Sequence, residues 1–282
     1  MRPLISIGMP VKNGFKVNSK EGINLEKSLN SILNQSYSNL EIIISNDCSD
    51  DQTGIFLEKI SKIDKRIKLF NQKDTLGLGP NFSFVLKKSS GEYFKWNAQD
   101  DLISEDYIEN NLNYLQNNPD YICSSSKFFY EDKTNNPLEY NLDGSLFERI
   151  KNFFKIRHNA HNLTHSLIKK EFIIKAIDFS NDFWAIDWIF GLNLLIMGKF
   201  KTIEKGSVIF GTDGMSRQKK FIKRKVYNKK KIYNIFPYYE LMKDLFLKTI
   251  FLKEMSIFEK ITIYYYSFKI NLYYFLKKFN FL

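Results

Sequence analysis

One stretch of the sequence decides the fold: residues 40–53, LEIIISNDCSDDQT, where a short apolar run ends in a cluster of polar and acidic residues. The run Glu41–Ser45 contains three consecutive isoleucines and is typical of a strand that is buried on both faces, as in a parallel sheet. The segment Asp50–Ile63, which follows, is predicted to be helical. The order of strand, polar turn and helix is the first half of a βαβ unit.

The same alternation continues on both sides of this stretch. Strands are predicted at 4–9, 41–45, 66–70, 92–96 and 121–125, and helices at 22–36, 50–63, 81–88 and 105–116. Strands separated by helices imply right-handed crossovers and an α/β fold, a Rossmann-like and mostly parallel sheet flanked by helices. Further along, the predictions are a loop or lid at 131–160, a strand at 163–168, helices at 170–177 and 185–197, and a hairpin at 201–210 that turns at Gly206.

The net charge of +11 is concentrated in the last quarter of the chain. Residues 219–282 contain 15 basic and 4 acidic residues, whereas residues 1–218 contain 27 of each. The neutral first part offers no basic groove, which argues against a partner that is a nucleic acid. The chain is therefore divided into a domain at 1–218 and a basic, aromatic helical extension at 219–282.

A helical stripe runs through the extension. Its members recur every three or four residues and are Phe258, Ile261, Tyr265, Phe268, Leu272, Phe275 and Phe279. One interpretation is a helix that packs on the domain or on a second copy in a homodimer. The other is a helix that lies in the plane of a membrane surface, since aromatic residues on one side and lysines elsewhere suit the headgroup region. The basic run at 219–231 favours the membrane.

Compartment is predicted from what the sequence lacks. We find no signal peptide and no uncharged apolar run long enough to span a bilayer. The two cysteines, Cys48 and Cys123, lie far apart and suit a reducing compartment. We therefore expect a cytoplasmic protein that is peripheral at the inner face of the membrane.

Polar residues follow the predicted strands at their carboxyl ends, where open α/β sheets bind ligands. In chain order these residues include Pro10, Asn13, Asp47, Asp100 and Asp101. A single acid in such a place often only caps the next helix, as we expect for Asp50 and Asp51. The neighbours Asp100 and Asp101 repel each other unless a cation is present. Carboxylate oxygens favour Mg²⁺ or Mn²⁺, which phosphate oxygens usually complete.

The order and spacing of these stretches resemble glycosyltransferase family 2, whose members have the GT-A fold. The matching segments are 5–14, 25–53, 76–101 and 185–200, within a resemblance that covers roughly residues 3–215. The resemblance implies an inverting, metal-dependent enzyme. It would move a sugar from a nucleotide-diphosphate donor, with a lean toward UDP-sugars, to a hydroxyl of a glycan or lipid-linked acceptor. A role in cell-surface polysaccharide synthesis is implied as well.

The resemblance also implies roles for residues around the nucleotide. Asp47 matches the acid that binds the nucleobase, and a carboxylate accepts well from the imide N–H of uracil. Pro10 and Asn13 match the turn beside the base. Arg217 follows the segment where relatives close over the diphosphate, so it is a candidate to neutralise the leaving group. The usual histidine of that segment is absent, and a solvated basic surface is the alternative.

Metal and base residues come from the same comparison. Asp100 matches the last acid of the family's DxD motif, which holds Mg²⁺ or Mn²⁺ on the diphosphate. The first acid of that motif aligns with Ala98, so metal binding is expected to involve Asp101 or water, or to be weaker than in the family. Asp187 aligns with the catalytic base that takes the proton of the acceptor hydroxyl. Its alternative role is a place in the first turn of an amphipathic helix.

Other interpretations stay open at this stage. His158, His161 and His165 do not have a recognised zinc spacing, and they lie where relatives bind the acceptor, so a substrate contact is an alternative. A sugar nucleotidyltransferase would normally carry a Gly-rich loop with Arg after the first strand, which residues 11–16 lack. A catalytically silent binding or scaffold protein is kept open by Ala98.

Overall fold

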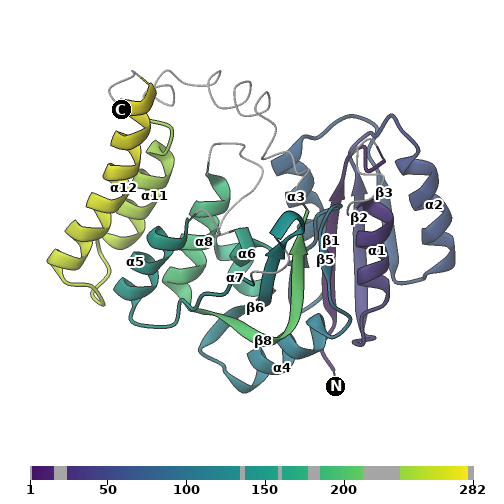
Figure 1. Cartoon of the computed structure of the whole chain (residues 1–282), viewed down its shortest axis with the longest axis horizontal. Helices are drawn as coiled ribbons and strands as arrows, with labels where there is room; N and C mark the ends of the chain where they lie inside the picture. The colour runs from purple at the N-terminus through teal and green to yellow at the C-terminus, as the bar shows by residue number, and fades with distance from the viewer. Residues whose placement is uncertain are drawn as a thin grey trace.

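Eight strands form one sheet in the computed structural model, which describes residues 2–15, 24–133, 137–157, 161–176, 185–211 and 236–278. The strands are β1 (Ile5–Val11), β2 (Leu40–Asn46), β3 (Ile67–Asn71), β4 (Tyr93–Trp96), β5 (Leu102–Ile103), β6 (Tyr121–Tyr130), β7 (Leu167–Lys169) and β8 (Lys199–Phe210). Their order across the sheet is β3-β2-β1-β4-β7-β6-β8-β5. Figure 1 shows that β1, β2 and β3 lie at one side and β6 and β8 toward the other.

Most neighbouring strands run parallel. β3, β2, β1 and β4 are parallel to one another, as are β6 and β8, whereas β7 and β5 run antiparallel to their partners. The predicted α/β fold with a mostly parallel sheet is therefore confirmed. Within β2, Ile42 and Ile44 belong to one apolar cluster and Ile43 to another, and all three are fully buried. This confirms that β2 is covered on both faces.

The helices connect and cover these strands. They are α1 (Leu25–Leu33), α2 (Thr53–Ile63), α3 (Leu78–Lys88), α4 (Tyr107–Asn117), α5 (Leu146–Ile156), α6 (His161–Thr164), α7 (Lys170–Ala176), α8 (Ile186–Met197), α11 (Tyr239–Thr249) and α12 (Ile257–Lys278), with a 3₁₀ turn at Glu131–Lys133. The predicted helices of the first 120 residues are all present, with ends shifted by a few residues. No helix in the described parts of the chain is both long and apolar enough to cross a bilayer.

Two predictions for the middle of the chain are wrong. The expected loop at 131–160 contains α5, which begins with a capping box in which the Ser145 side chain and Glu148 satisfy each other's backbone N–H. The expected hairpin at 201–210 is one continuous strand, β8, which pairs parallel with β6. Its register shifts between Ile203 and Ser207, and Gly206 has a φ of +76° there, so the glycine allows a bulge instead of a turn. The region predicted as a strand at 163–168 contains the end of α6 and the start of β7.

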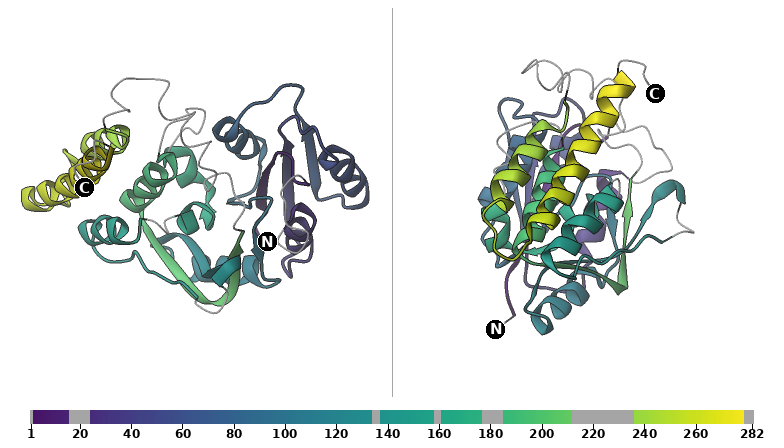
Figure 2. Two further views of the ribbon diagram at one scale, coloured as in Figure 1. Left: turned by 45° about the horizontal axis from the view of Figure 1, so that its top comes forward. Right: turned by 90° about the vertical axis from the view of Figure 1, so that its left-hand side faces the viewer.

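The two C-terminal helices pack on the rest of the molecule. Figure 2 shows α11 and α12 side by side at one end, and they share an apolar cluster with α5 and α8. Tyr238, just before α11, stacks on Trp188 of α8 with ring centroids 5.0 Å apart. The predicted domain boundary at 218 and the basic run at 219–231 lie outside the described residues, so the boundary stays a prediction.

A close approach fixes β1 against its neighbours. A Cβ on Gly8 would lie 2.5 Å from the ring of Phe94 in β4 and 2.8 Å from Val85 in α3. These are side chains of the buried core, so there is no space into which they could move freely.

We therefore predict that Gly8→Val lowers the free energy of unfolding by about 1–3 kcal/mol, because overpacking forces buried side chains from their rotamers. Chemical denaturation of the purified protein measures this. The matched control is Gly54→Ala in α2, where the nearest atom to a new Cβ is 3.4 Å away. It should be neutral or stabilising because alanine favours a helix. Equal stability of Gly8→Val and wild type would contradict the close packing of β1.

Candidate active site

The carboxyl ends of β1, β2 and β4 meet at one edge of the sheet. Val11 pairs with Asn46 at the end of β2, and Gly8 pairs with Trp96 at the end of β4. The loop 97–101 extends beyond β4 and is fastened to the end of β1. The Gln99 side chain accepts from the Lys12 backbone N–H at 2.9 Å and donates to its carbonyl at 3.1 Å. The side chain thus imitates one more pair of strand hydrogen bonds.

Asn97 holds the same loop from inside. Its buried side-chain amide donates to Ser28 Oγ and to the carbonyls of Ala98 and Asp101, at 3.1 to 3.2 Å. Ser28 Oγ in turn donates to the Ala98 carbonyl at 2.8 Å. The position that the DxD motif would fill with its first acid therefore serves as a fixed backbone corner. Neither Asn97 nor Gln99 was picked out from the sequence, although each is a polar residue directly after a buried strand.

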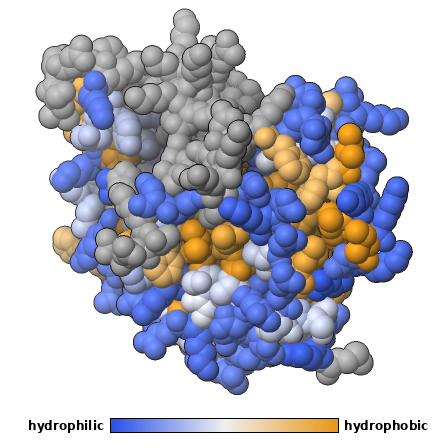
Figure 3. Space-filling model, turned by 45° about the vertical axis from the view of Figure 1, so that its right-hand side comes forward, coloured by the Kyte–Doolittle hydropathy of each residue, from blue (hydrophilic) through white to orange (hydrophobic). Residues whose placement is uncertain are grey.

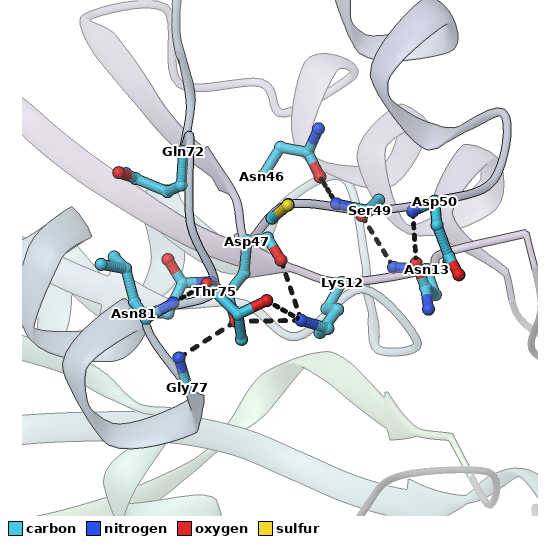
Figure 4. Close-up of polar contacts among 12 residues, drawn as sticks. Lys12, Asn13, Asn46, Asp47, Ser49, Asp50, Gln72, Thr75, Gly77 and Asn81 are labelled. Carbon is cyan, nitrogen blue, oxygen red and sulfur yellow. Dashed lines mark hydrogen bonds and ion pairs between the residues drawn. The ribbon is translucent and has the colours of Figure 1, made fainter.

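Asn13 connects the ends of β1 and β2. It has a φ of 51°, its backbone N–H donates to Ser49 Oγ at 2.9 Å, and its side-chain oxygen accepts from the Asp50 N–H at 3.1 Å. Figure 4 shows these two contacts side by side. Pro10 is buried within β1, opposite Ser45. The structure thus brings both predicted turn residues to the edge where Asp47 lies.

Asp47 is almost fully buried and ties a third segment to this edge. Its carboxylate accepts from the backbone N–H groups of Leu76 at 2.5 Å and Gly77 at 3.2 Å, between β3 and α3. The Lys12 ammonium lies 3.7 Å from the same carboxylate and donates to the carbonyl of Asp47 and to Thr75 Oγ1 (Figure 4). A carboxylate has about four acceptor positions, so these contacts leave an acceptor position of Asp47 unused, at a side chain that the surrounding segments nearly shield from solvent.

Asp101 points into the protein, although its neighbour Asp100 is partly exposed. Asp101 accepts from the Gly211 N–H at 3.2 Å, at the end of β8. Burial raises the pKa of Asp101, and the charge of Asp100 acts in the same direction. Burial also lowers the pKa of Lys95, whose ammonium donates to the carbonyls of Trp96 and His165 at 3.0 and 2.8 Å. Through these hydrogen bonds, Lys95 and Asp101 connect β4 and the loop 97–101 to His165 and Gly211.

A divalent cation would fit at Asp100 with few protein ligands. Within the described residues, no three His, Cys, Asp or Glu side chains are grouped to hold a metal ion. Magnesium commonly uses one or two carboxylates and takes its other ligands from water and phosphate. Asp100 can supply one such ligand at the exposed edge, whereas Asp101 is only 6% exposed and already accepts a backbone N–H. The donor set therefore suits an ion that arrives with a diphosphate.

Asp187 lies in the first turn of α8 and is half-buried. Burial raises its pKa to about 6, although the backbone N–H groups of Trp188 and of Asp187 itself act in the opposite direction. The preceding Ala185 has a φ of 62°, which is a costly conformation for a residue other than glycine. A carboxylate with a pKa of about 6 is well suited to accept a proton near neutral pH.

Aromatic contacts dock α8 onto β4, the strand that leads into the loop of Asp100. Trp96 at the end of β4 packs edge-on against Phe190 of α8, with ring centroids 5.7 Å apart. Trp96 is fully buried and Trp188 nearly so, so both are core residues. Arg217 lies outside the described residues.

Neither His161 nor His165 belongs to a group of three or more described side chains that could hold a metal ion. His161 shares a hydrogen bond of 3.1 Å with the Tyr130 hydroxyl and packs edge-on against Phe210. His165 is desolvated, which lowers its pKa to about 3 and keeps it neutral, and its Nδ1 lies 3.9 Å from Asp101. His158 lies outside the described residues.

Comparisons with known proteins agree with this arrangement. An uncharacterized glycosyltransferase of Haemophilus influenzae is 41% identical over 104 residues, which is 37% of this chain and 32% of that protein. A second one from the same organism is 29% identical over 179 residues, 64% of this chain and 67% of its own length. The match thus spans about a third of the first relative and two thirds of the second.

Solved structures show the same fold at low identity. TarS 1-349 of S. aureus in complex with UDP-GlcNAc has a TM-score of 0.66 and 15% identity, over 93% of this chain and 70% of that one. The mannosyltransferase PcManGT from Pyrobaculum calidifontis, in complex with GDP-Man and Mn²⁺, has a TM-score of 0.58 and 14% identity, over 94% and 69%. These likenesses confirm the GT-A type of fold. The model of the family "Glycosyl transferase family 2" matches residues 6–179, more than half of the chain, and the protein therefore belongs to glycosyltransferase family 2.

Proposed function

We propose that the protein is an inverting, metal-dependent glycosyltransferase. It moves a sugar from a nucleoside-diphosphate donor, with UDP-sugars preferred, to a hydroxyl of a glycan or lipid-linked acceptor in cell-surface polysaccharide synthesis. The observation that supports this proposal is that Asp47 and the loop of Asp100 follow parallel strands at one sheet edge. Asp187, with a pKa raised to about 6, lies in the first turn of α8, and α8 contacts the end of β4 through Phe190 and Trp96. Solved structures of similar fold hold UDP-GlcNAc, or GDP-Man with Mn²⁺, which supports such a donor.

The donor would be bound by its two ends. Asp47 accepts the imide N–H of the base, next to the turn formed by Pro10 and Asn13. Asp100 would hold Mg²⁺ or Mn²⁺ when the diphosphate binds, and Asp101 supports the loop from its buried position. The metal supplies Lewis-acid stabilisation of the departing diphosphate. Arg217 is proposed to add a positive charge near that leaving group.

The transfer itself needs one proton acceptor. Asp187 takes the proton from the acceptor hydroxyl while that oxygen forms a bond to the anomeric carbon. The bond between the anomeric carbon and the diphosphate oxygen breaks, and the electron pair leaves with the nucleoside diphosphate. Attack from the side opposite the leaving group inverts the anomeric configuration, which requires Asp187 and the acceptor to lie across the sugar from the diphosphate.

The enzyme would work on the cytoplasmic side of a membrane that carries a lipid-linked acceptor. The charge of residues 219–282 supports this location, because this segment contains 15 basic residues and only 4 acidic ones. A homodimer through the C-terminal helices is the alternative use of this region. A catalytically silent binding protein is the alternative that Ala98 favours, because it leaves the DxD motif one carboxylate short.

Replacing the proposed base tests the mechanism. We predict that Asp187→Asn lowers the rate of transfer about a hundredfold or more, because the amide cannot accept the proton. Donor affinity should stay within about twofold, because the base does not touch the nucleotide. Product formation by chromatography and titration with UDP measure the two quantities. The matched control is Glu171→Gln, an exposed acid in the first turn of α7, which should keep wild-type turnover. Full turnover by Asp187→Asn would show that the base is another group.

The pH profile gives a second test of Asp187. A base works in its deprotonated form, so a raised pKa means that activity is lost as the pH falls below about 6. We expect kcat/KM to rise about tenfold per pH unit below that value and to level off above it. Measurement over this range in overlapping buffers gives the profile. A curve that is flat through pH 6 would mean that Asp187 does not titrate in the rate-determining step.

Metal use can be separated from nucleotide binding. We predict that Mn²⁺ strengthens UDP binding to the wild-type protein, and that Asp100→Asn removes this gain, about tenfold or 1.4 kcal/mol. Binding of UDP without metal should persist because Asp47 is unchanged. Thermal-shift titrations with and without Mn²⁺ measure both effects. Glu105→Gln, an exposed acid four residues beyond Asp101, is the control and should respond to Mn²⁺ like wild type. A Mn²⁺ effect that survives in Asp100→Asn would remove Asp100 from the metal site.

A further inference from the structure

An exposed apolar surface runs along the outer side of α12 and the connection that precedes it. We define the tail face by its six members, Phe251, Phe258, Ile261, Tyr265, Phe268 and Leu272. Their side chains are between 37% and 88% exposed, and five of them belong to the stripe that the sequence shows. Of the remaining stripe residues, Phe275 is half-buried and Phe279 lies outside the described residues.

The packing of α12 explains why this face is turned outward. The helix buries its opposite side, where Ile263 and Ile270 enter the shared core. Tyr266 stacks on Phe154 of α5, with ring centroids 6.0 Å apart. On the other flank, the ring of Tyr264 lies against the ring of Phe246 in α11, with centroids 5.2 Å apart. Neighbours therefore occupy the inner side and both flanks of α12, and the tail face is the side that they leave. Figure 2 shows α11 and α12 at the outer end of the molecule.

The charges around the tail face are mostly positive. Residues 236–278 contain seven lysines and four acids. Glu240 and Asp244 lie near Lys243 and Lys248 along α11, and Glu254 and Glu259 each adjoin a lysine in the sequence. The excess of three lysines is therefore in α12. Lys253 in the connection and Lys269 on α12 are exposed and stand among the residues of the tail face. An apolar strip with lysines beside it matches a surface that is apolar inside and anionic outside.

We propose that the tail face lies on an anionic phospholipid bilayer, with α12 in the plane of the headgroups and its aromatic side chains inserted among them. This rests on the proposed function, in which the acceptor is held at a membrane. A second copy of the chain is a poorer occupant. A symmetric pair would bring the same surface of both copies together, and this surface has more lysines than acids on each side. Lipid phosphates carry the complementary charge.

Vesicle sedimentation with the full-length protein tests the proposal. We expect binding to vesicles of phosphatidylglycerol mixed with phosphatidylcholine, and much weaker binding to pure phosphatidylcholine. The double variant Ile261→Glu/Phe268→Glu should lose about tenfold in affinity per substitution, because each removes an apolar side chain from the bilayer. Lys253→Gln and Lys269→Gln should each weaken binding to the anionic vesicles about fivefold and leave binding to neutral vesicles unchanged.

The control uses exposed apolar residues at the other end of the molecule. The surface toward α2 is mostly hydrophilic with apolar side chains between (Figure 3), and Ile55 and Ile63 of α2 are 75% and 70% exposed. Ile55→Glu/Ile63→Glu carries the same added charge and should bind vesicles like wild type. Vesicle binding by Ile261→Glu/Phe268→Glu that equals wild type would overturn the proposal. So would a wild-type dimer that this variant dissociates, together with no binding to anionic vesicles.

Turnover measured without vesicles keeps this test apart from the proposed function. The tail-face variant should hydrolyse or transfer the donor sugar at the wild-type rate in solution, since none of its substitutions touches the sheet edge. A wild-type protein that binds anionic vesicles but never turns over a sugar nucleotide would refute the enzyme and leave the tail face as a membrane contact. A protein that turns over a sugar nucleotide but does not bind anionic vesicles would support the enzyme and refute the membrane contact of the tail face.

Discussion

The parallel pairing of β1 with β2 on one side and β4 on the other is the constraint on which the rest of the structure depends. Because Gly8 has no side chain, the ring of Phe94 and the side chain of Val85 in α3 can lie directly against β1. β1 and β2 end opposite each other, whereas β4 ends opposite Gly8 and the loop 97–101 continues toward the same edge. Each strand then continues into polar residues at the same edge. Their loops are joined by side-chain contacts to backbone, such as Gln99 to Lys12 and Asn13 to Asp50. These contacts hold the loops together as a polar rim along this edge of the sheet.

Behind this rim the protein buries two titratable side chains. Lys95 and Asp101 are both buried, and burying a charge costs far more than burying an apolar group unless partners compensate. Here the ammonium has two carbonyl partners and the carboxylate has the Gly211 N–H. The contact at Gly211 also determines where the chain leaves β8, because a Cβ at this position would lie 2.8 Å from the Cβ of Asp100. The segment after β8 therefore starts beside the rim.

Most of the first half of the fold could be predicted because its signals are local. The triple isoleucine of β2 and the periodic leucines of α1 each specify their own element. The failures concern information that is not local. Gly206 signals a left-handed backbone but not whether the chain turns back or bulges, and the pairing of β8 with β6 decides this. On α12 the periodicity grouped the right residues, yet it could not tell that the opposite side, with the polar Asn271, is the buried one. In the candidate site, the acids are predicted from the sequence and stay predictions. The amides that hold their loops, Asn97 and Gln99, are not predicted, because amides after a strand are common and their partners lie far along the chain.

The stacking of Tyr238 on Trp188 limits how far the chain can be shortened from its C-terminal end. The backbone N–H of Tyr238 donates to the side chain of Asn271, and its ring lies against Trp188, the residue after Asp187. A chain that stops before α11 would uncover the indole and admit water around the neighbouring carboxylate, whose raised pKa depends on burial. The C-terminal helices are thus part of the environment of the proposed base. A chain truncated before α11 would therefore lose the burial around Asp187 together with the tail face.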